Sequence, residues 1–191
     1  MDLILASTSV YRRNLLARLP LEFRCENPEV DETAAVGEAP EALARRLALA
    51  KANSVSQRFP GALVIGSDQV ASRDGQLLGK PGNERAAFDQ LSASSGQRVA
   101  FHTAVALVGG RSERQRVHVE LVEVKFRELE RAEIQRYLAI DEPFDCAGSF
   151  KVEQLGIALF EKIVERDPTS LQGLPLIALC SMLRDVGYLL P

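Results

Sequence analysis

A run of apolar residues, Ala62–Gly66, constrains the fold of this chain most strongly. It follows the turn signal Pro60-Gly61 and contains no polar side chain. A continuous apolar run of this length is typical of a strand that is buried on both faces, at the centre of a sheet that helices cover. The run therefore predicts an α/β protein.

Helix and strand signals alternate in the first half of the sequence, whereas two long strand patterns follow one another later. Capping residues and periodic apolar positions predict strands at Leu3–Ala6, Val99–Val108 and Val117–Phe126, a hairpin turn at Asp74-Gly75, and helices that begin near Ser9, Pro40, Asn83, Arg131 and Pro175. The first helix is expected to stop at Pro20. In the last strand the apolar positions shift from 117, 119 and 121 to 122, 124 and 126, which predicts a bulge or a change of buried face. We expect an α/β fold with a mixed twisted sheet flanked by helices, arranged as two lobes around a central cleft.

Length and composition exclude several classes of protein. With 191 residues, the chain is expected to form a single domain over residues 1–191. Hydrophobic residues (46%) and charged residues (26%) are close to the globular average, which excludes a disordered or fibrous chain. The net charge of -3 argues against a coat on nucleic acid.

The sequence carries no sign of a membrane or of an oxidising compartment. No apolar run approaches the ~20 residues of a membrane span, and the N-terminal MDLILA lacks the basic region of a signal peptide. Cys25, Cys146 and Cys180 are odd in number and far apart, which fits a reducing compartment. We therefore expect a cytoplasmic protein that acts on a small molecule.

Several catalytic signatures are absent from the sequence, among them HExxH, CxxC and GxSxG. The segment Gly75–Pro81 resembles a phosphate-binding loop, but it has three residues between its glycines rather than four. Pro81 also stands where a Ser or Thr would bind magnesium. His102 and His118 lie inside strand patterns, so a histidine-based site is not expected.

The segment Ser7–Arg13 lies where a predicted strand ends and a helix begins. Free backbone amides point into such a turn, and Arg12 and Arg13 in the first helical turn oppose the helix dipole. A phosphate bound there would reverse this repulsion, because the amides, the dipole and the guanidinium groups would act on one anion. The alternative is that both arginines point to solvent or pair with nearby acids.

Acidic residues provide candidates for metal binding and water activation. Asp68 follows the central strand, at the edge where open α/β sheets bind their ligands, and a carboxylate there can bind a metal or activate water. Its alternative role is to cap a turn. The adjacent Asp31 and Glu32 either solvate a loop or supply further metal-binding oxygens.

Two lysines are candidates for phosphate binding. Lys51 lies four residues after Leu47 and so near the buried face of its helix, where it either snorkels to solvent or points into a cleft. Lys80 lies on a rigid loop between Gly79 and Pro81. An anion with several phosphates would suit the set Ser7, Arg12, Arg13, Lys51 and Lys80, and a divalent cation with a water would suit Asp31, Glu32 and Asp68.

The sequence resembles the Maf family of nucleoside triphosphate pyrophosphatases through nearly its whole length. The motifs that carry the resemblance are LILASTSVYRRNLL, PEVDET, LAxxKA around Lys51, IGSDQV, LGKP, CAGSFKVEQLGIALFEKI and DPTSLQGLPLIALCSML. SDQV, CAGSFK and the aromatic Tyr11 are most similar to the branch that hydrolyses 7-methylguanosine triphosphate. The branch for UTP and dTTP usually has an arginine at the position of Tyr11 and a threonine at that of Gln69.

The resemblance implies an ITPase-like fold and hydrolysis between the α and β phosphates of a nucleotide, with Mg²⁺ or Mn²⁺ and as a homodimer. It implies that Asp68 is the general base, that Glu32 binds metal or water, and that base choice depends on Tyr11, Gln69 and Glu153. Phosphate binding is implied for Ser7, Arg12, Lys51 and Lys80. Val10 in place of the usual proline and Tyr11 in place of the frequent tryptophan are departures from the branch.

The expected role is to remove modified nucleotides from the pool. The alternatives are a pyrophosphatase for UTP, dTTP or other modified nucleotides, and a nucleotide-binding regulator of cell division with little turnover. A pure binding protein has no need of a water-activating carboxylate beside its phosphate-binding residues.

Overall fold

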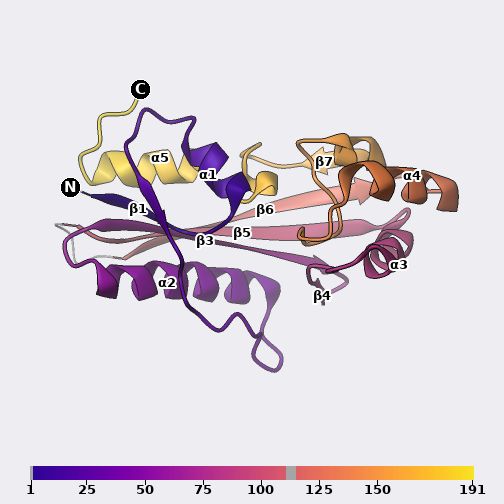
Figure 1. The fold of residues 1–191 in the computed structure, drawn as a ribbon, viewed down its shortest axis with the longest axis horizontal. Coiled ribbons are helices and arrows are strands. Elements are labelled where there is room, and N and C mark those ends of the chain that lie inside the picture. The colour runs from indigo at the N-terminus through magenta and orange to yellow at the C-terminus, as the bar shows by residue number, and fades with distance from the viewer. Residues whose placement is uncertain (1, 111–114) are drawn as a thin grey trace. The chain divides into compact units, whose positions relative to one another are not determined.

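The computed structural model describes residues 2–110 and 115–191 and has an α/β fold on a mixed sheet (Figure 1). The strand order is β2-β1-β3-β5-β6-β7, and β4 pairs with β3. The strands are β1 (Leu3–Ala6), β2 (Arg24–Glu26), β3 (Leu63–Arg73), β4 (Gln76–Leu78), β5 (Arg98–Gly109), β6 (Arg116–Phe126) and β7 (Phe160–Val164). The helices are α1 (Val10–Leu16), α2 (Pro40–Arg58), α3 (Glu84–Ser94), α4 (Arg131–Asp141) and α5 (Leu176–Asp185), with 3-10 helices η1 (Leu155–Leu159) and η2 (Ser170–Gln172). The expected mixed sheet with flanking helices is confirmed.

The chain forms two compact units. The first contains the described residues of Met1–Gln69, Thr103–Glu120 and Asp167–Pro191. The second contains Val70–His102 and Leu121–Arg166. Strands β3, β5 and β6 each contribute one part to each unit.

In the first unit, β1 pairs in parallel with β2 on one side and with β3 on the other. Figure 1 shows α1 and α5 on one face of these strands and α2 on the opposite face. Leu5 and Ile65 are buried in a cluster with Leu16 of α1 and Leu179 of α5, whereas Gly66 faces α2. Both faces are buried, which explains why the run at the start of β3 contains no polar residue.

Gly66 brings α2 unusually close to β3. A Cβ atom built on this glycine would lie 2.1 Å from the carbonyl oxygen of Ala48 and 2.7 Å from the amide nitrogen of Ala52, both on α2. Contacts this short with backbone atoms are possible only if the helix moves away. A residue without a side chain at this position therefore sets the distance between α2, which carries Lys51, and the strand that carries Asp68.

Replacing Gly66 by alanine should displace α2 and destabilise the protein. Overpacking of this kind typically costs ~1–3 kcal/mol, which lowers the melting temperature by about 2–4 °C per kcal/mol in a chain of this size. Thermal unfolding of Gly66→Ala would measure this loss. Gly79→Ala is the matched control, because a Cβ there meets nothing within 4 Å. Equal melting temperatures for the two variants would contradict the close approach.

The second unit contains a cluster of phenylalanine rings. Phe150 packs edge-on against Phe101, Phe126 and Phe160, with ring centroids 5.3, 5.9 and 4.7 Å apart. The turn expected at Asp74-Gly75 joins the antiparallel strands β3 and β4, and both residues have the positive φ that such a turn requires.

Three expectations about the elements need correction. Strand β3 does not stop at Gly66 but continues to Arg73, because β4 pairs with its far end. Asp68 therefore lies within a strand rather than after one. Helix α1 ends at Leu16, well before Pro20. In β6 the buried positions are 120, 122, 124 and 126, so the expected change of buried face does not occur over these residues; the register against β7 shifts between Lys125 and Phe126.

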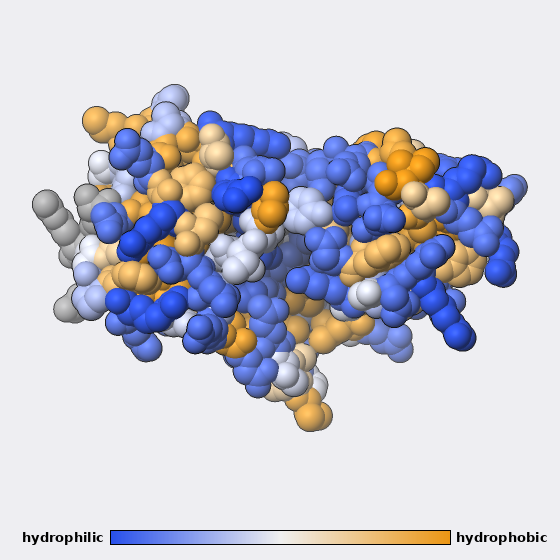
Figure 2. Space-filling model, viewed as in Figure 1, coloured by the Kyte–Doolittle hydropathy of each residue, from blue (hydrophilic) through white to orange (hydrophobic). Residues whose placement is uncertain are grey.

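The surface in view in Figure 2 is mostly hydrophilic, and hydrophobic residues form small groups among the polar ones. Exposed large apolar side chains are spread over many elements, for example Val36 before α2, Ile140 in α4 and Ile177 in α5. Within residues 2–110 and 115–191, every helix is too short or too polar to cross a membrane.

Candidate active site

The candidate site lies in the first unit, where β1 and β3 stop pairing with each other. Ala6 is in register with Gly66, so the residues that follow them in the two strands emerge at the same edge. Ser7 is buried in the turn between β1 and α1, and its Oγ accepts a hydrogen bond of 3.1 Å from the Ser9 amide. Ser9 caps α1 as expected, with its Oγ accepting from the Arg12 amide.

A buried lysine joins two carboxylates at this edge. The Lys51 Nζ donates to Asp68 Oδ1 at 2.6 Å and lies 2.6 Å from Glu32 Oε1. Lys51 is 4% exposed and Asp68 is 6% exposed, whereas the Glu32 side chain is 57% exposed. The ammonium is bonded inside the protein, so Lys51 is not a snorkelling residue.

Burial and neighbouring charges oppose each other at Asp68. Burial raises the pKa of the Asp68 carboxyl above its ordinary value, the positive charges of Lys51 and Arg12 lower it, and the negative charge of Glu32 raises it. Burial also lowers the pKa of Arg12, against the charges of Asp68 and Glu32. These couplings place the Arg12 guanidinium in the same group of charges as the three residues joined by hydrogen bonds.

Backbone carbonyls hold Arg12 and Ser67 at the site. The Arg12 Nε donates to the Gly173 carbonyl at 2.9 Å. The Ser67 Oγ lies 2.9 Å from the same carbonyl and 2.8 Å from the carbonyl of Ala104. Gly173 has a φ of 112°, a conformation that favours glycine. One carbonyl therefore orients side chains from α1 and β3.

Gln69 is held by the same segment. Its Nε2, which carries two hydrogens, faces three acceptors: the carbonyls of Ser170 and Leu171 at 3.0 and 3.1 Å and Thr103 Oγ1 at 3.0 Å. The Thr103 hydroxyl itself donates to the Ser170 carbonyl at 2.9 Å, so it faces Gln69 as an acceptor. Because every one of these neighbours accepts, the amide orientation is fixed with its nitrogen toward the carbonyls.

The loop that carries the acidic pair is fastened to α2. The Arg46 side chain donates to the Thr33 carbonyl at 3.0 Å and pairs with Glu38 at 2.7 Å. This contact lowers the pKa of Glu38 to about 2. Asp31 turns toward its own loop and accepts from the Thr33 amide at 2.9 Å, whereas Glu32 reaches Lys51.

The remaining predicted site residues are spread over both units. Tyr11 is half-buried and Arg13 is exposed in the first turns of α1. Lys80 and Glu153 belong to the second unit and are exposed. Lys80 lies between β4 and α3, and Glu153 lies in the turn before η1.

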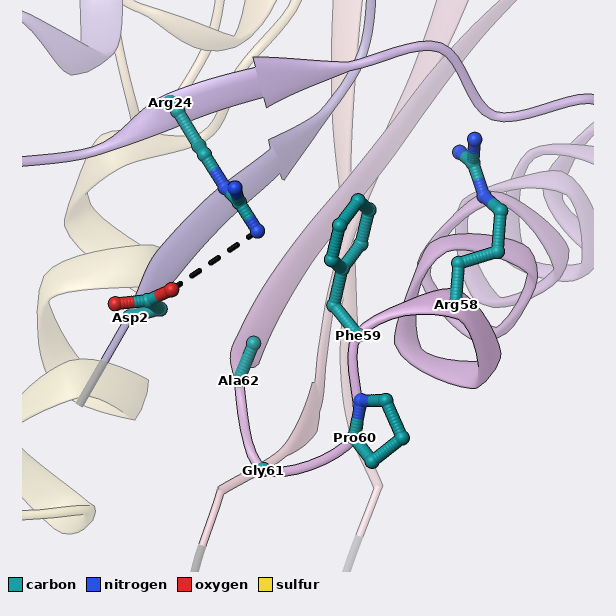
Figure 3. A pocket seen from close by; sticks show the side chains of 7 residues that line it. All are labelled: Asp2, Arg24, Arg58, Phe59, Pro60, Gly61 and Ala62. Atoms are coloured by element: carbon teal, nitrogen blue, oxygen red, sulfur yellow. Dashed lines mark ion pairs between the residues drawn. The ribbon is translucent and has the colours of Figure 1, made fainter.

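A pocket of about 430 Å³ lies at the other end of the same strands (Figure 3). Phe59 stands between the guanidinium groups of Arg24 and Arg58, which are 4.3 and 5.7 Å from its ring centroid. Asp2 precedes β1 and pairs with Arg24 at 3.9 Å. The end of a parallel strand where ligands bind is the carboxyl end, so this pocket is separate from the candidate site.

A family model described as Maf-like protein matches residues 2–186. The chain belongs to the Maf family.

Relatives of this Maf protein are named for an activity. A protein of Xanthomonas oryzae pv. oryzae (strain MAFF 311018), named 7-methyl-GTP pyrophosphatase, is 59% identical over 189 residues, which are 99% of this chain and 98% of the relative. A protein of Xanthomonas axonopodis pv. citri (strain 306) with the same name is 59% identical over the same shares of both chains. The Ham1 protein of Staphylococcus aureus has a similar fold, with a TM-score of 0.56 at 15% identity, covering 97% of this chain and 100% of that one.

Two carboxylates of the candidate site fit a divalent cation. One oxygen of Glu32 and one of Asp68 lie 2.6 Å from the same ammonium nitrogen, so both reach a single positive centre. Mg²⁺ in proteins is usually held by one or two carboxylates together with substrate phosphates and water. In the described part of the chain, His, Cys, Asp and Glu do not gather in threes to form a metal site.

The sequence did not indicate the groups that orient Arg12 and Gln69 by hydrogen bonds. The Gly173 carbonyl accepts from Arg12 and from Ser67, and the carbonyls of Ser170 and Leu171 together with the Thr103 hydroxyl hold Gln69. The motif DPTSLQGLP is part of the family pattern, but backbone carbonyls leave no trace in side-chain chemistry. The glycine that ends this segment was the one available signal.

The pKa of Asp68 in the metal-free Maf protein should lie above 3.8, its ordinary value. The folded protein then binds this proton more tightly than the unfolded chain. The contribution of Asp68 to the free energy of unfolding is therefore present below pH 3.8 and is lost as the pH rises through the raised pKa of the folded protein. Carbon NMR titration of the carboxyl measures the pKa directly. Glu32→Gln should lower it, because a negative neighbour is lost, and Lys51→Met should raise it. A wild-type pKa below 3.8 would contradict the balance of burial and charge.

Proposed function

We propose that this protein hydrolyses 7-methylguanosine triphosphate between its α and β phosphates, giving 7-methylguanosine monophosphate and diphosphate. The observation that carries the proposal is the buried Asp68 carboxylate, held 2.6 Å from the Lys51 ammonium and coupled to Arg12. Such an arrangement combines a base with cations for a phosphate chain. The relatives named 7-methyl-GTP pyrophosphatase support the choice of substrate.

Asp68 acts as the general base. Burial raises its pKa and so makes the carboxylate a better proton acceptor, while Lys51 and Arg12 favour its ionised form. The carboxylate takes a proton from a water as the water oxygen bonds to the α phosphorus. The bond from this phosphorus to the bridging oxygen breaks, and diphosphate leaves with the electron pair.

Lys51 and Arg12 stabilise negative charge on the phosphates. An ammonium has three N–H groups, so Lys51 can bind a phosphate oxygen in addition to Glu32 and Asp68. Arg12 is oriented by the Gly173 carbonyl through Nε, which leaves the two terminal nitrogens of its guanidinium to face an anion. Ser7 and the amides at the start of α1 are proposed as further phosphate contacts.

Glu32 and Asp68 would hold Mg²⁺ or Mn²⁺ together with the phosphates, with Asp31 as the further ligand that the sequence suggests. A bound divalent cation supplies polarisation of the water and neutralisation of phosphate charge. From its place in the first turn of α1 we also propose Arg13 as a phosphate contact. From the resemblance we propose Lys80 as another phosphate contact, a homodimer, and a house-cleaning role in the cytoplasm.

Three residues are proposed to select the base. A 7-methylguanine ring carries a positive charge, and an aromatic face attracts a cation by ~0.5–2 kcal/mol. Tyr11 supplies such a face and Glu153 an opposite charge. Gln69 turns its nitrogen to the carbonyls, so its oxygen is the atom that accepts from an N–H group of the base.

A panel of nucleotides tests the function. Diphosphate release should be fastest from 7-methylguanosine triphosphate. A preference for UTP or dTTP would instead assign the protein to the branch of the family that hydrolyses UTP and dTTP. Tight binding without turnover of any nucleotide would favour the second alternative, a regulator that acts through a partner protein.

Asp68→Asn should lower turnover by ~10²–10⁴-fold, because the amide keeps the size of the side chain but cannot accept the proton. Nucleotide affinity, measured by calorimetry, should change much less. Asp185→Asn, at an exposed position at the end of α5, is the matched control. Turnover of Asp68→Asn within threefold of the control would remove Asp68 from the role of base.

Base choice is tested by a ratio of rate constants. Glu153→Gln and Tyr11→Leu should each lower kcat/KM for the methylated triphosphate relative to that for GTP, because each removes attraction to the positive ring. Glu161→Gln, which makes the same change at an exposed position in β7, serves as the control. An unchanged ratio in both site variants would show that other residues read the base.

A further inference from the structure

A second buried carboxylate in the first unit takes no part in the mechanism above. Asp167 is 2% exposed. One of its oxygens accepts from the Thr169 amide at 2.9 Å and from the Thr169 hydroxyl at 2.6 Å, and the other accepts from the Ile177 amide at 2.7 Å. Three donors satisfy this carboxylate, and one of them belongs to the first turn of α5.

Thr169 makes further hydrogen bonds to the backbone of residues 174–176. Its Oγ accepts from the Leu176 amide at 2.9 Å and lies 2.8 Å from the Leu174 carbonyl. A hydroxyl has one proton, and the shorter contact together with the negative charge assigns it to Asp167. We call these two residues and their bonds the Asp167–Thr169 clasp. It ties the start of the segment to the start of α5.

The clasp encloses the carbonyls that hold the active-site side chains. Between Thr169 and Leu174 lie Ser170, Leu171 and Gly173, whose carbonyls accept from Gln69, Thr103, Ser67 and Arg12. These acceptors are backbone carbonyl groups, so no side-chain rotamer sets the direction in which they point. Their direction depends on the backbone of the segment, and the bonds of the clasp bridge that backbone at both ends.

We infer that Asp167 and Thr169 are positioning residues for the hydrolysis: the Asp167–Thr169 clasp fixes the 170–173 carbonyls that orient Arg12 toward the phosphates and Gln69 toward the base. The inference rests on the proposed function. It extends that function to two residues that touch neither the phosphates nor the base. A misplacement of about 1 Å far from the reacting atoms can lower a rate by ~10²-fold.

The chemistry of the clasp makes two substitutions informative. Asp167→Asn keeps the volume but places an NH₂ group against an N–H donor, whichever way the amide turns, so at least one bond is lost. Thr169→Val keeps the shape but removes the hydroxyl, and Thr169→Ser restores it. Ser94→Ala is the control, because Ser94 is 1% exposed and its hydroxyl donates to the Gln90 carbonyl within α3, in the second unit.

The experiment measures kcat and KM of each variant for 7-methylguanosine triphosphate and GTP, together with the melting temperature. Asp167→Asn and Thr169→Val should lower kcat by about tenfold or more, within the range that small misplacements produce, and should lower the preference for the methylated base. Thr169→Ser should restore both values. Ser94→Ala should lower the melting temperature comparably while keeping kcat and the preference.

Two results would overturn the inference and are distinguishable from failure of the proposed function. If the wild type is active and Thr169→Val changes the melting temperature but matches Ser94→Ala in kcat and preference, the clasp is merely structural. If Thr169→Ser is as impaired as Thr169→Val, the hydroxyl is not the positioning group. Comparison of Thr169→Val with Thr169→Ser tests the inference even if Asp167→Asn does not fold. A wild type that hydrolyses no nucleotide overturns the proposed function itself, and the positioning role with it.

Discussion

A buried ammonium shared by two carboxylates is the interaction on which the candidate site depends. Lys51 holds Asp68 and Glu32 at 2.6 Å each, so an acid from a strand, an acid from a loop and a cation from a helix meet at one point. Removing charges from water is costly unless each is paired, so the pairing is a condition for keeping Asp68 both buried and ionised. That combination is what a proton acceptor beside a phosphate chain requires.

The fold places these three groups through constraints that are mainly steric. Parallel pairing of β1 and β3, with Ala6 opposite Gly66, brings the turn before α1 and the Asp68 segment to one edge. The missing side chain of Gly66 lets α2 approach to backbone contact, which carries Lys51 toward Asp68. Arg46 then fastens the loop of Glu32 to the same helix. Strand pairing and close packing therefore determine where the charged groups of the site meet.

The sequence indicated Lys51, Asp68 and Glu32, which meet at the candidate site, but not the backbone that positions the site. Lys51 stood out because it lies near the buried face of its helix, and Ala62–Gly66 identified the buried strand because its residues carry no polar side chain. The continuation of β3 past Asp68 was missed, since polar residues in a strand depend on partners that only the folded chain supplies. The 170–173 carbonyls were missed for a related reason: every residue has a carbonyl, and only the path of the backbone decides which ones converge on Arg12 and Gln69.

In the proposed reaction, water attacks the α phosphorus of 7-methylguanosine triphosphate. Hydrolysis in H₂¹⁸O, followed by mass spectrometry of both products, tests this step most directly. We expect one ¹⁸O atom in 7-methylguanosine monophosphate and none in diphosphate. Label in diphosphate would show attack at the β phosphorus, and release of inorganic phosphate with the nucleoside diphosphate would show cleavage at the other bond. Either result would contradict attack at the α phosphorus.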